Sequence, residues 1–219
     1  GSGKTLASLN FALQLKKRLE NKTNQDYKIV YSIPFTSIID QTYKIFNEDL
    51  QIPNEILLRH HHLTETRSIQ YKNSSSETEI EPYISPELNS IVIESWEFDL
   101  IVTTFVQLFE SLITNNKENI KKVHNLYQSI IIIDECQNIP TKYWDTLKYL
   151  FEKFTLYFDS YLIFLTATQP LIFDNNESST PIELLEDHTR YFKNKNRTKL
   201  IPVLSEKGID DFVKFIENE

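Results

Sequence analysis

An unbroken run of four isoleucines, Ile130 to Ile133, constrains the fold of this chain more than any other feature. Such a run is typical of a strand that is buried on both faces, the usual state of strands in a parallel sheet. Asp134 and Glu135 follow directly, and ligands of open α/β sheets bind at the carboxyl ends of the strands. One carboxylate suits a hard cation such as Mg²⁺, and the other suits the orientation or deprotonation of a water. A strand that ends in two solvated acids is the alternative, and this segment alone does not decide between them.

The first five residues, Gly1-Ser2-Gly3-Lys4-Thr5, match the end of the phosphate-binding pattern G-x-x-x-x-G-K-[ST]. Glycine lets the backbone curl so that N–H groups point at phosphate oxygens, and the helix that follows adds its positive end. We expect Lys4 to reach the β- and γ-phosphates of a nucleotide and Thr5 to bind Mg²⁺. A Gly-Ser-Gly cloning scar is the alternative, but the Lys-Thr pair and the amphipathic pattern after it favour the loop. Because the motif is incomplete, we treat the chain as a piece of a longer protein and expect weaker nucleotide binding than in its parent.

Three further apolar segments end in polar residues, as the isoleucine run does. Residues 28–33 lead into Pro34-Phe35-Thr36-Ser37, residues 99–103 into Thr104, and residues 160–165 into Thr166-Ala167-Thr168. Helical patterns separate these segments, so we expect an α/β fold with a mainly parallel sheet, helices on both faces and the polar segments along one edge. The expected helices are 6–19, 38–49 with Thr36 or Ser37 as N-cap, 86–95, 105–113 capped by Thr104, 118–126, and one that begins at Pro140.

Histidine and cysteine residues offer weaker signals. A short strand at 57–59 runs into His60, His61 and His62, but consecutive residues rarely supply the geometry of a metal site, so a polar loop edge is favoured. Residues 64–82 are polar and read as a mobile surface loop. Cys136 is expected to be a packed residue behind the site rather than a nucleophile, because no base is evident beside it.

Composition excludes several classes of protein. A net charge of −8 over 219 residues argues against a general basic coat for nucleic acid, although not against a local basic groove. One cysteine excludes an internal disulfide framework and fits a reducing compartment, so we expect a cytoplasmic protein. We expect no membrane-spanning segment and no signal peptide.

A phosphate loop followed by a strand-terminal Asp-Glu is a joint signal for nucleoside triphosphate hydrolysis. Five segments occur in the order of superfamily 2 helicases and resemble their motifs I, Ia, Ic, II and III: residues 1–5, 33–37, 103–105, 134–137 and 166–168. Asp-Glu-Cys-Gln, together with residues 34–42 and 104–112, narrows the resemblance to the CRISPR-associated helicase-nuclease of type I interference systems. The resemblance covers nearly the whole chain, and the superfamily match is more specific than the CRISPR assignment.

The resemblance implies a three-layer RecA-like domain that uses ATP and Mg²⁺, and it assigns roles to residues. Lys4, Asp134 and Glu135 are the implied catalytic residues. Asp134 holds Mg²⁺ together with Thr5, and Glu135 activates the attacking water. The residues implied to bind the nucleotide are Gly1, Ser2, Gly3, Lys4, Thr5 and Gln137. Those implied to lie along single-stranded DNA are Pro34, Phe35, Thr36, Ser37, Thr103 and Thr104. Those implied to couple hydrolysis to strand movement are Thr166, Ala167 and Thr168.

The resemblance also implies a biological role. Enzymes of this type unwind invading DNA in antiviral defence after an RNA-guided CRISPR surveillance complex recruits them, and a His-Asp nuclease domain is fused or separate. We expect residues 1–196 to form the first RecA-like lobe and residues 197–219 to lead toward a second lobe. Because ATP is hydrolysed between two lobes, we expect this piece alone to be nearly inactive.

Three other readings stay open. Another superfamily 2 translocase, acting on DNA or RNA, would carry almost the same motifs. A P-loop ATPase that does not act on nucleic acid would turn over ATP without stimulation by a polynucleotide. A degenerate lobe kept as a binding platform is disfavoured by the intact Lys4, Thr5, Asp134 and Glu135.

Overall fold

A five-stranded parallel sheet forms the centre of the fold. The computed structural model describes residues 3–61, 92–113, 117–166, 181–184 and 208, and the chain divides into two units, Gly1–Thr180 and Pro181–Glu219. Only the first unit is described below. Its strands are β1 (Lys28–Ile33), β2 (Leu57–His60), β3 (Leu100–Thr104), β4 (Ser129–Ile133) and β5 (Tyr161–Phe164), in the spatial order β2-β3-β1-β4-β5.

The strand order places a functional position between β1 and β4. The chain leaves β1 for β2, on one side of the sheet, and leaves β4 for β5, on the other. Connections that diverge from two neighbouring strands open a crevice at their carboxyl ends, which is where open α/β sheets bind ligands. Asp134 and Glu135 follow β4 directly, so they lie at this crevice.

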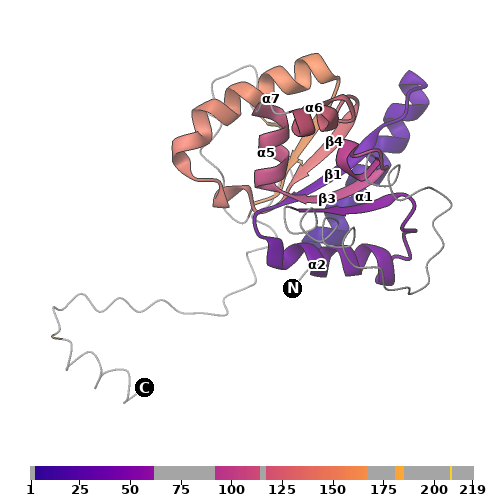
Figure 1. Cartoon of the computed structure of the whole chain (residues 1–219), viewed down its shortest axis with the longest axis horizontal. Helices are drawn as coiled ribbons and strands as arrows, with labels where there is room; N and C mark the ends of the chain where they lie inside the picture. The colour runs from indigo at the N-terminus through magenta and orange to yellow at the C-terminus, as the bar shows by residue number, and fades with distance from the viewer. Residues whose placement is uncertain (1–2, 62–91, 114–116, 167–180, 185–207, 209–219) are drawn as a thin grey trace. The chain divides into compact units, whose positions relative to one another are not determined.

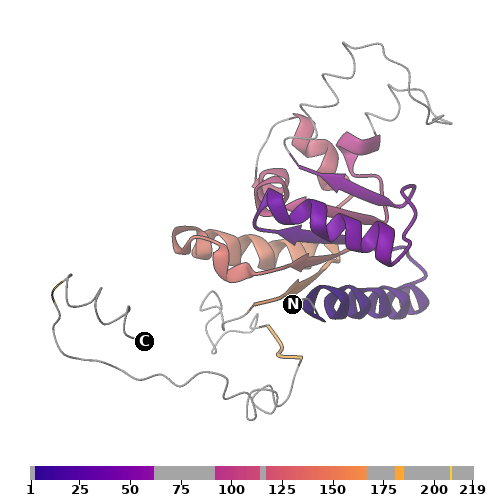
Figure 2. The same cartoon turned by 90° about the horizontal axis from the view of Figure 1, so that it is seen from below.

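Helices cover both faces of the sheet and make three layers. The helices are α1 (Gly3–Thr23), α2 (Thr36–Lys44), α5 (Phe105–Ile113), α6 (Lys117–His124) and α7 (Trp144–Phe158). Figure 1 shows α5, α6 and α7 on one side of the sheet and α2 on the other, and α2 lies in front of the sheet when it is seen from below (Figure 2). Helix α1 packs in the same hydrophobic cluster as α2. None of the described helices is long and apolar enough to cross a membrane.

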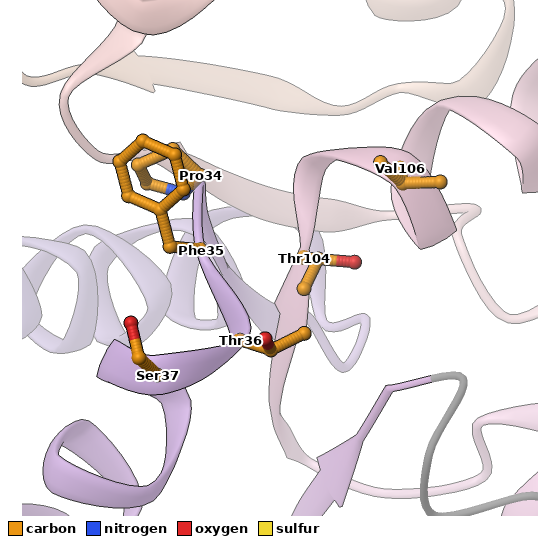
Figure 3. Close-up of a pocket in the computed structure, with 6 residues that line it drawn as sticks. All are labelled: Pro34, Phe35, Thr36, Ser37, Thr104 and Val106. Carbon is orange, nitrogen blue, oxygen red and sulfur yellow. The ribbon is translucent and has the colours of Figure 1, made fainter.

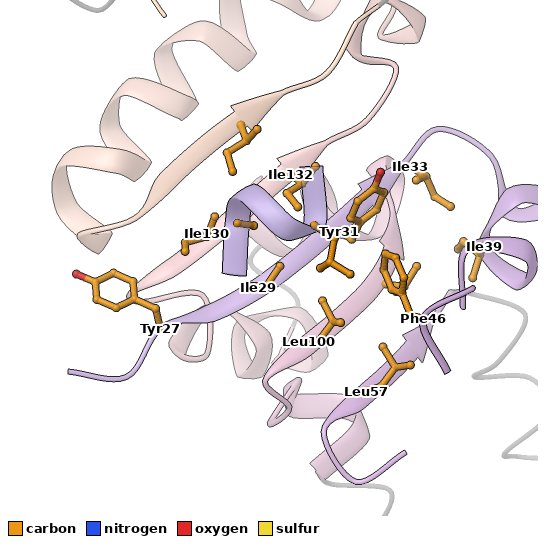
Figure 4. Close-up of a cluster of buried hydrophobic side chains, with 14 of the residues drawn as sticks. Tyr27, Ile29, Tyr31, Ile33, Ile39, Phe46, Leu57, Leu100, Ile130 and Ile132 are labelled. Atoms are coloured by element: carbon orange, nitrogen blue, oxygen red, sulfur yellow. The ribbon is translucent and has the colours of Figure 1, made fainter. Parts of the chain in front are cut away.

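The isoleucine run is buried from both sides, as the sequence predicts. Ile130 and Ile132 pack in the cluster that α1 and α2 cover, whereas Ile131 and Ile133 pack in the cluster under α5 and α7. The same alternation holds in β1, where Ile29 and Tyr31 face the first cluster, shown in Figure 4. Each fully buried aliphatic side chain contributes about 1.5–3 kcal/mol, so these two clusters supply much of the free energy that favours folding. The α/β prediction with helices on both faces is therefore confirmed.

The start of α2 differs from the prediction. The helix begins at Thr36, its N-cap is the extended Phe35 (φ −127°, ψ 138°), and no side chain caps it. Thr36 and Ser37 lie inside the first turn, so the prediction that one of them is the N-cap was wrong. Thr104, by contrast, does cap α5, because its hydroxyl oxygen accepts a hydrogen bond of 3.2 Å from the backbone N–H of Gln107.

Other boundaries shift by a few residues. The helix predicted over 38–49 changes at Ile45 into a π-helical turn, Ile45–Asp49. Pro140 is followed by a 3₁₀ turn, Thr141–Tyr143, before α7 begins at Trp144. The loop predicted at 64–82 and most of the helix predicted at 86–95 lie outside the described residues.

His60 corrects the prediction of a polar loop edge. It is the last residue of β2 and is only 1% exposed, and its ring meets the ring of Trp96 edge-on with 5.6 Å between centroids. Burial, together with the positive charge of Lys122 and the neighbouring His61, lowers the pKa of His60 to about 3. The prediction of a polar edge was therefore wrong for His60. His62 lies outside the described residues.

The buried His60 predicts loss of stability in mild acid. Above pH 6.5 the His60 ring is neutral in both the folded and the unfolded chain. Below pH 6.5 the ring is protonated in the unfolded chain, whereas in the folded chain it stays neutral down to about pH 3. Stability therefore falls as pH falls, by about 2 kcal/mol between pH 7 and pH 5 from this residue. Urea unfolding of wild type, His60→Gln and the exposed control His124→Gln measures this contribution. The His60→Gln variant should lack it and the control should keep it; equal pH dependence in all three would contradict the assignment.

Candidate functional site

Residues far apart in the sequence meet at the carboxyl ends of β1 and β4. Lys4 Nζ, in the first turn of α1, donates a hydrogen bond of 2.7 Å to Oε1 of Glu135, 131 positions away. The Tyr31 hydroxyl donates a bond of 2.9 Å to Oδ2 of Asp134, and the backbone N–H of Asp134 donates to the carbonyl of Ser32. The start of α1 and the ends of the two strands thus assemble one polar site.

Glu135 is held in an ionised state. It adopts a left-handed backbone conformation (φ 54°, ψ 44°), which is uncommon for a residue with a side chain and often occurs at functional sites. Hydrogen bonds from Lys4 and Gln137 lower the pKa of Glu135 below its usual value. The carboxylate is therefore charged at neutral pH, and it can accept a proton from water once Lys4 moves away.

Asp134 has the features of a cation ligand. Burial raises its pKa, the Tyr31 hydrogen bond lowers it, and the neighbouring charge of Glu135 raises it again. Oδ1 is buried and meets no hydrogen-bond donor among the residues that the structure describes. A buried carboxylate oxygen without a donor is costly unless a proton or a cation meets it. The buried oxygen of Asp134 therefore fits a hard cation such as Mg²⁺.

A groove lies between the ends of β1 and β3, beside this site. Its volume is about 350 Å³. Figure 3 shows its lining residues, which come from the turn after β1, the first turn of α2, the end of β3 and the first turn of α5: Pro34, Phe35, Thr36, Ser37, Thr104 and Val106. Phe35 and Val106 are more than half exposed, so the groove offers apolar surface as well as hydroxyl groups. Thr103 is fully buried in β3 and is not among the lining residues.

Comparison with known proteins identifies the family. Residues 1–174 match the model of the DEAD/DEAH box helicases. The chain belongs to this family. It is also 32% identical, over 194 residues, to the CRISPR-associated nuclease/helicase Cas3 of Haloferax volcanii, a match that covers 87% of the chain and 20% of that protein. The chain thus spans about a fifth of the length of that relative, and it corresponds to a helicase ATP-binding lobe of RecA-like fold.

Thr166, the first residue of the predicted coupling segment, follows β5 closely. Strands β4 and β5 are neighbours, and the backbone N–H of Cys136 donates to the carbonyl of Leu165, one residue before Thr166. Burial raises the pKa of the Cys136 thiol to about 11. The prediction that Cys136 is a packed residue is confirmed, and a raised thiol pKa disfavours the reactive thiolate. Gly1, Ser2, Ala167 and Thr168 lie outside the described residues.

Two residues of the site were missed at the level of sequence. Tyr31 contacts Asp134, and Val106 lines the groove two residues after Thr104. The signal for Tyr31 was present as a phenol within a predicted buried strand, since a buried phenol usually requires a hydrogen-bond partner. Val106 had no such signal, because an apolar residue in the first turn of a helix is more often part of the core.

Proposed function

We propose that this chain is the ATP-hydrolysing lobe of a DNA helicase that unwinds target DNA in type I CRISPR interference. The observation that carries the proposal is the meeting of Lys4, Asp134 and Glu135 at one sheet edge, next to a groove formed by the ends of β1 and β3. The likeness to a CRISPR-associated nuclease/helicase supports the biological role. The proposed partners are single-stranded DNA, an RNA-guided surveillance complex and a fused or separate His-Asp nuclease domain, in the cytoplasm.

The Lys4–Glu135 contact suggests how the site responds to nucleotide. The ammonium of Lys4 lies 2.7 Å from Oε1 of Glu135 and neutralises its charge. A triphosphate would draw Lys4 toward the β- and γ-phosphates, because these carry more negative charge than one carboxylate. Glu135 would then be free to orient the attacking water and take its proton. Mg²⁺, held by Asp134 and Thr5, would offset the charge of the phosphates.

A single lobe is not expected to complete this reaction. We place residues 1–196 in the first RecA-like lobe and residues 197–219 in a connection toward a second one. Hydrolysis in such enzymes takes place between two lobes, so the isolated chain should be nearly inactive. Strong helicase activity from the 219 residues alone would contradict this part of the proposal.

ATP turnover by the intact protein tests the choice of polymer. Turnover is measured without polynucleotide, with single-stranded DNA and with single-stranded RNA. Strong stimulation by DNA supports the proposal. Stimulation by RNA alone would point to an RNA translocase, and no stimulation by either polymer would point to a P-loop ATPase that does not act on nucleic acid.

A charge placed in the groove tests the DNA-binding surface. Ser37→Glu should lower the affinity of the intact protein for single-stranded DNA by roughly tenfold or more, because one added carboxylate repels a nearby phosphate by about 1–4 kcal/mol. A glutamate in the first turn of α2 is favourable for the helix, so folding should be preserved. Fluorescence anisotropy with a labelled oligonucleotide gives the affinity.

The matched control is Gln41→Glu, which adds the same charge to an exposed position of α2 that does not line the groove. This control should bind DNA within about twofold of wild type at 0.15 M salt, where charges outside the contact are screened. Equal losses in the two variants would show that the net charge, rather than the groove, decides binding.

A further inference from the structure

Tyr31 lies where three parts of the site meet. The side chain is fully buried, and its hydroxyl contacts Asp134 of the β4 end at 2.9 Å and Ser8 of α1 at 3.4 Å. The hydroxyl of Thr5 also interacts with this phenol. One phenolic oxygen thus connects the helix of the phosphate loop to the carboxylate that follows the isoleucine strand.

The hydrogen bond from Tyr31 gives the two carboxylate oxygens of Asp134 different environments. Oδ2 accepts the hydrogen bond from Tyr31, whereas Oδ1 is buried and meets no donor among the described residues. A carboxylate can rotate about its terminal torsion, which has a broad energy minimum, so the tyrosine bond selects one orientation. Removing a residue that hydrogen-bonds to a metal ligand commonly lowers the metal affinity by a factor of about 10 to 100.

We propose that Tyr31 is a positioning residue for the divalent cation: it holds Oδ2 of Asp134 so that Oδ1 is the oxygen presented to the metal. The inference rests on the proposed function, because it requires an ATP site with a bound cation. Tyr31 itself does not touch the cation and acts through Asp134.

The ring of Tyr31 is fixed from the other side by the segment that continues α2. Phe46, in the π-helical turn Ile45–Asp49, meets the ring edge-on with 5.4 Å between centroids. Figure 4 shows the hydroxyl on the side of the ring that points away from Phe46. The segment that directly follows α2, the helix whose first turn lines the groove, therefore packs against Tyr31.

The test removes the hydroxyl and keeps the ring. In the intact protein, binding of a fluorescent, non-hydrolysable ATP analogue is measured over a range of Mg²⁺ concentrations and also in EDTA. Tyr31→Phe should raise the Mg²⁺ concentration at half-saturation by about tenfold or more, while affinity for the analogue in EDTA stays within about twofold of wild type. Both readouts are independent of turnover.

Tyr27→Phe is the matched control. Tyr27 is also buried beside the same strand, and its hydroxyl donates a bond of 3.2 Å to an aspartate, Asp159, at the opposite end of the sheet. This control should leave the Mg²⁺ dependence unchanged, because its phenol is remote from Asp134.

Three results would overturn the inference. An unchanged Mg²⁺ dependence in Tyr31→Phe would show that the hydroxyl does not orient Asp134. Equal losses of analogue binding in EDTA and in Mg²⁺ would assign Tyr31 to the structure of the pocket rather than to the cation. A wild-type protein that binds no analogue under either condition would instead remove the proposed ATP site, and the inference with it.

Discussion

Glu135→Gln is expected to lower ATP turnover by the intact protein at least about 100-fold while leaving Mg·ATP binding in place. Glutamine has nearly the same shape as glutamate, but its amide cannot accept the proton of the attacking water. Binding should persist or tighten, because the substitution removes the 2.7 Å ion pair that Lys4 must leave before it reaches a phosphate. Turnover and analogue affinity are measured on the same preparation, so the two effects separate.

The control for this substitution is Glu110→Gln, which removes an exposed carboxylate from α5, outside the site. It should leave turnover within about twofold of wild type. Turnover by Glu135→Gln equal to that of wild type would remove Glu135 from its assigned role. Loss of binding together with turnover would indicate that the carboxylate supports the pocket rather than the chemistry.

Lys4→Ala is expected to reduce ATP turnover by about 10² to 10³, the usual loss when a positive group that meets developing phosphate charge is removed. Unlike Glu135→Gln, this variant should also bind ATP more weakly, because Lys4 contacts the phosphates in the ground state as well. Steady-state turnover over a range of ATP concentrations and analogue binding together give the two effects.

The loss should not come from unfolding. The side chains of Lys4 and Glu135 are 50% and 32% exposed, and an ion pair so open to water contributes at most about 1 kcal/mol to stability. Thermal unfolding of Lys4→Ala should therefore follow wild type closely. Lys17→Ala, an exposed lysine on the same helix, is the control and should keep full turnover. A variant of Lys4 with normal turnover would contradict the reading of residues 1–5 as a phosphate loop.

The fold could be predicted from the local sequence pattern, because the spacing of apolar residues within a short segment indicates whether it forms a strand or a helix and which residues are buried. Four strands, the edge that carries the polar residues and the described helices between the strands followed from apolar runs and the residues that end them, with boundaries that shift by a few residues. The position of Glu135 beside Lys4 agrees with the rule that ligands of open α/β sheets bind at the carboxyl ends of the strands. None of these inferences needed knowledge of which distant residues touch.

The features that pattern did not reveal depend on distant partners. His60 sits in a polar stretch of sequence, but its ring packs against Trp96, 36 positions later, and the charge of Lys122 helps to lower its pKa. The start of α2 was misassigned because Thr36 and Ser37 are good capping residues, yet their side chains line the groove. The proposed role of Tyr31 depends on the pairing of β1 with β4, and the sequence does not show which strands are neighbours.

The measurement that tests the central claim most directly is strand displacement by the intact protein on a duplex with a single-stranded DNA tail, with Mg²⁺ and with or without ATP. Asp134→Asn is the comparison, because it removes one charge from the proposed cation ligand and keeps the shape of the side chain. The account predicts displacement by wild type that requires ATP and is lost in the variant. Displacement that proceeds equally without ATP, or equally in Asp134→Asn, would contradict it.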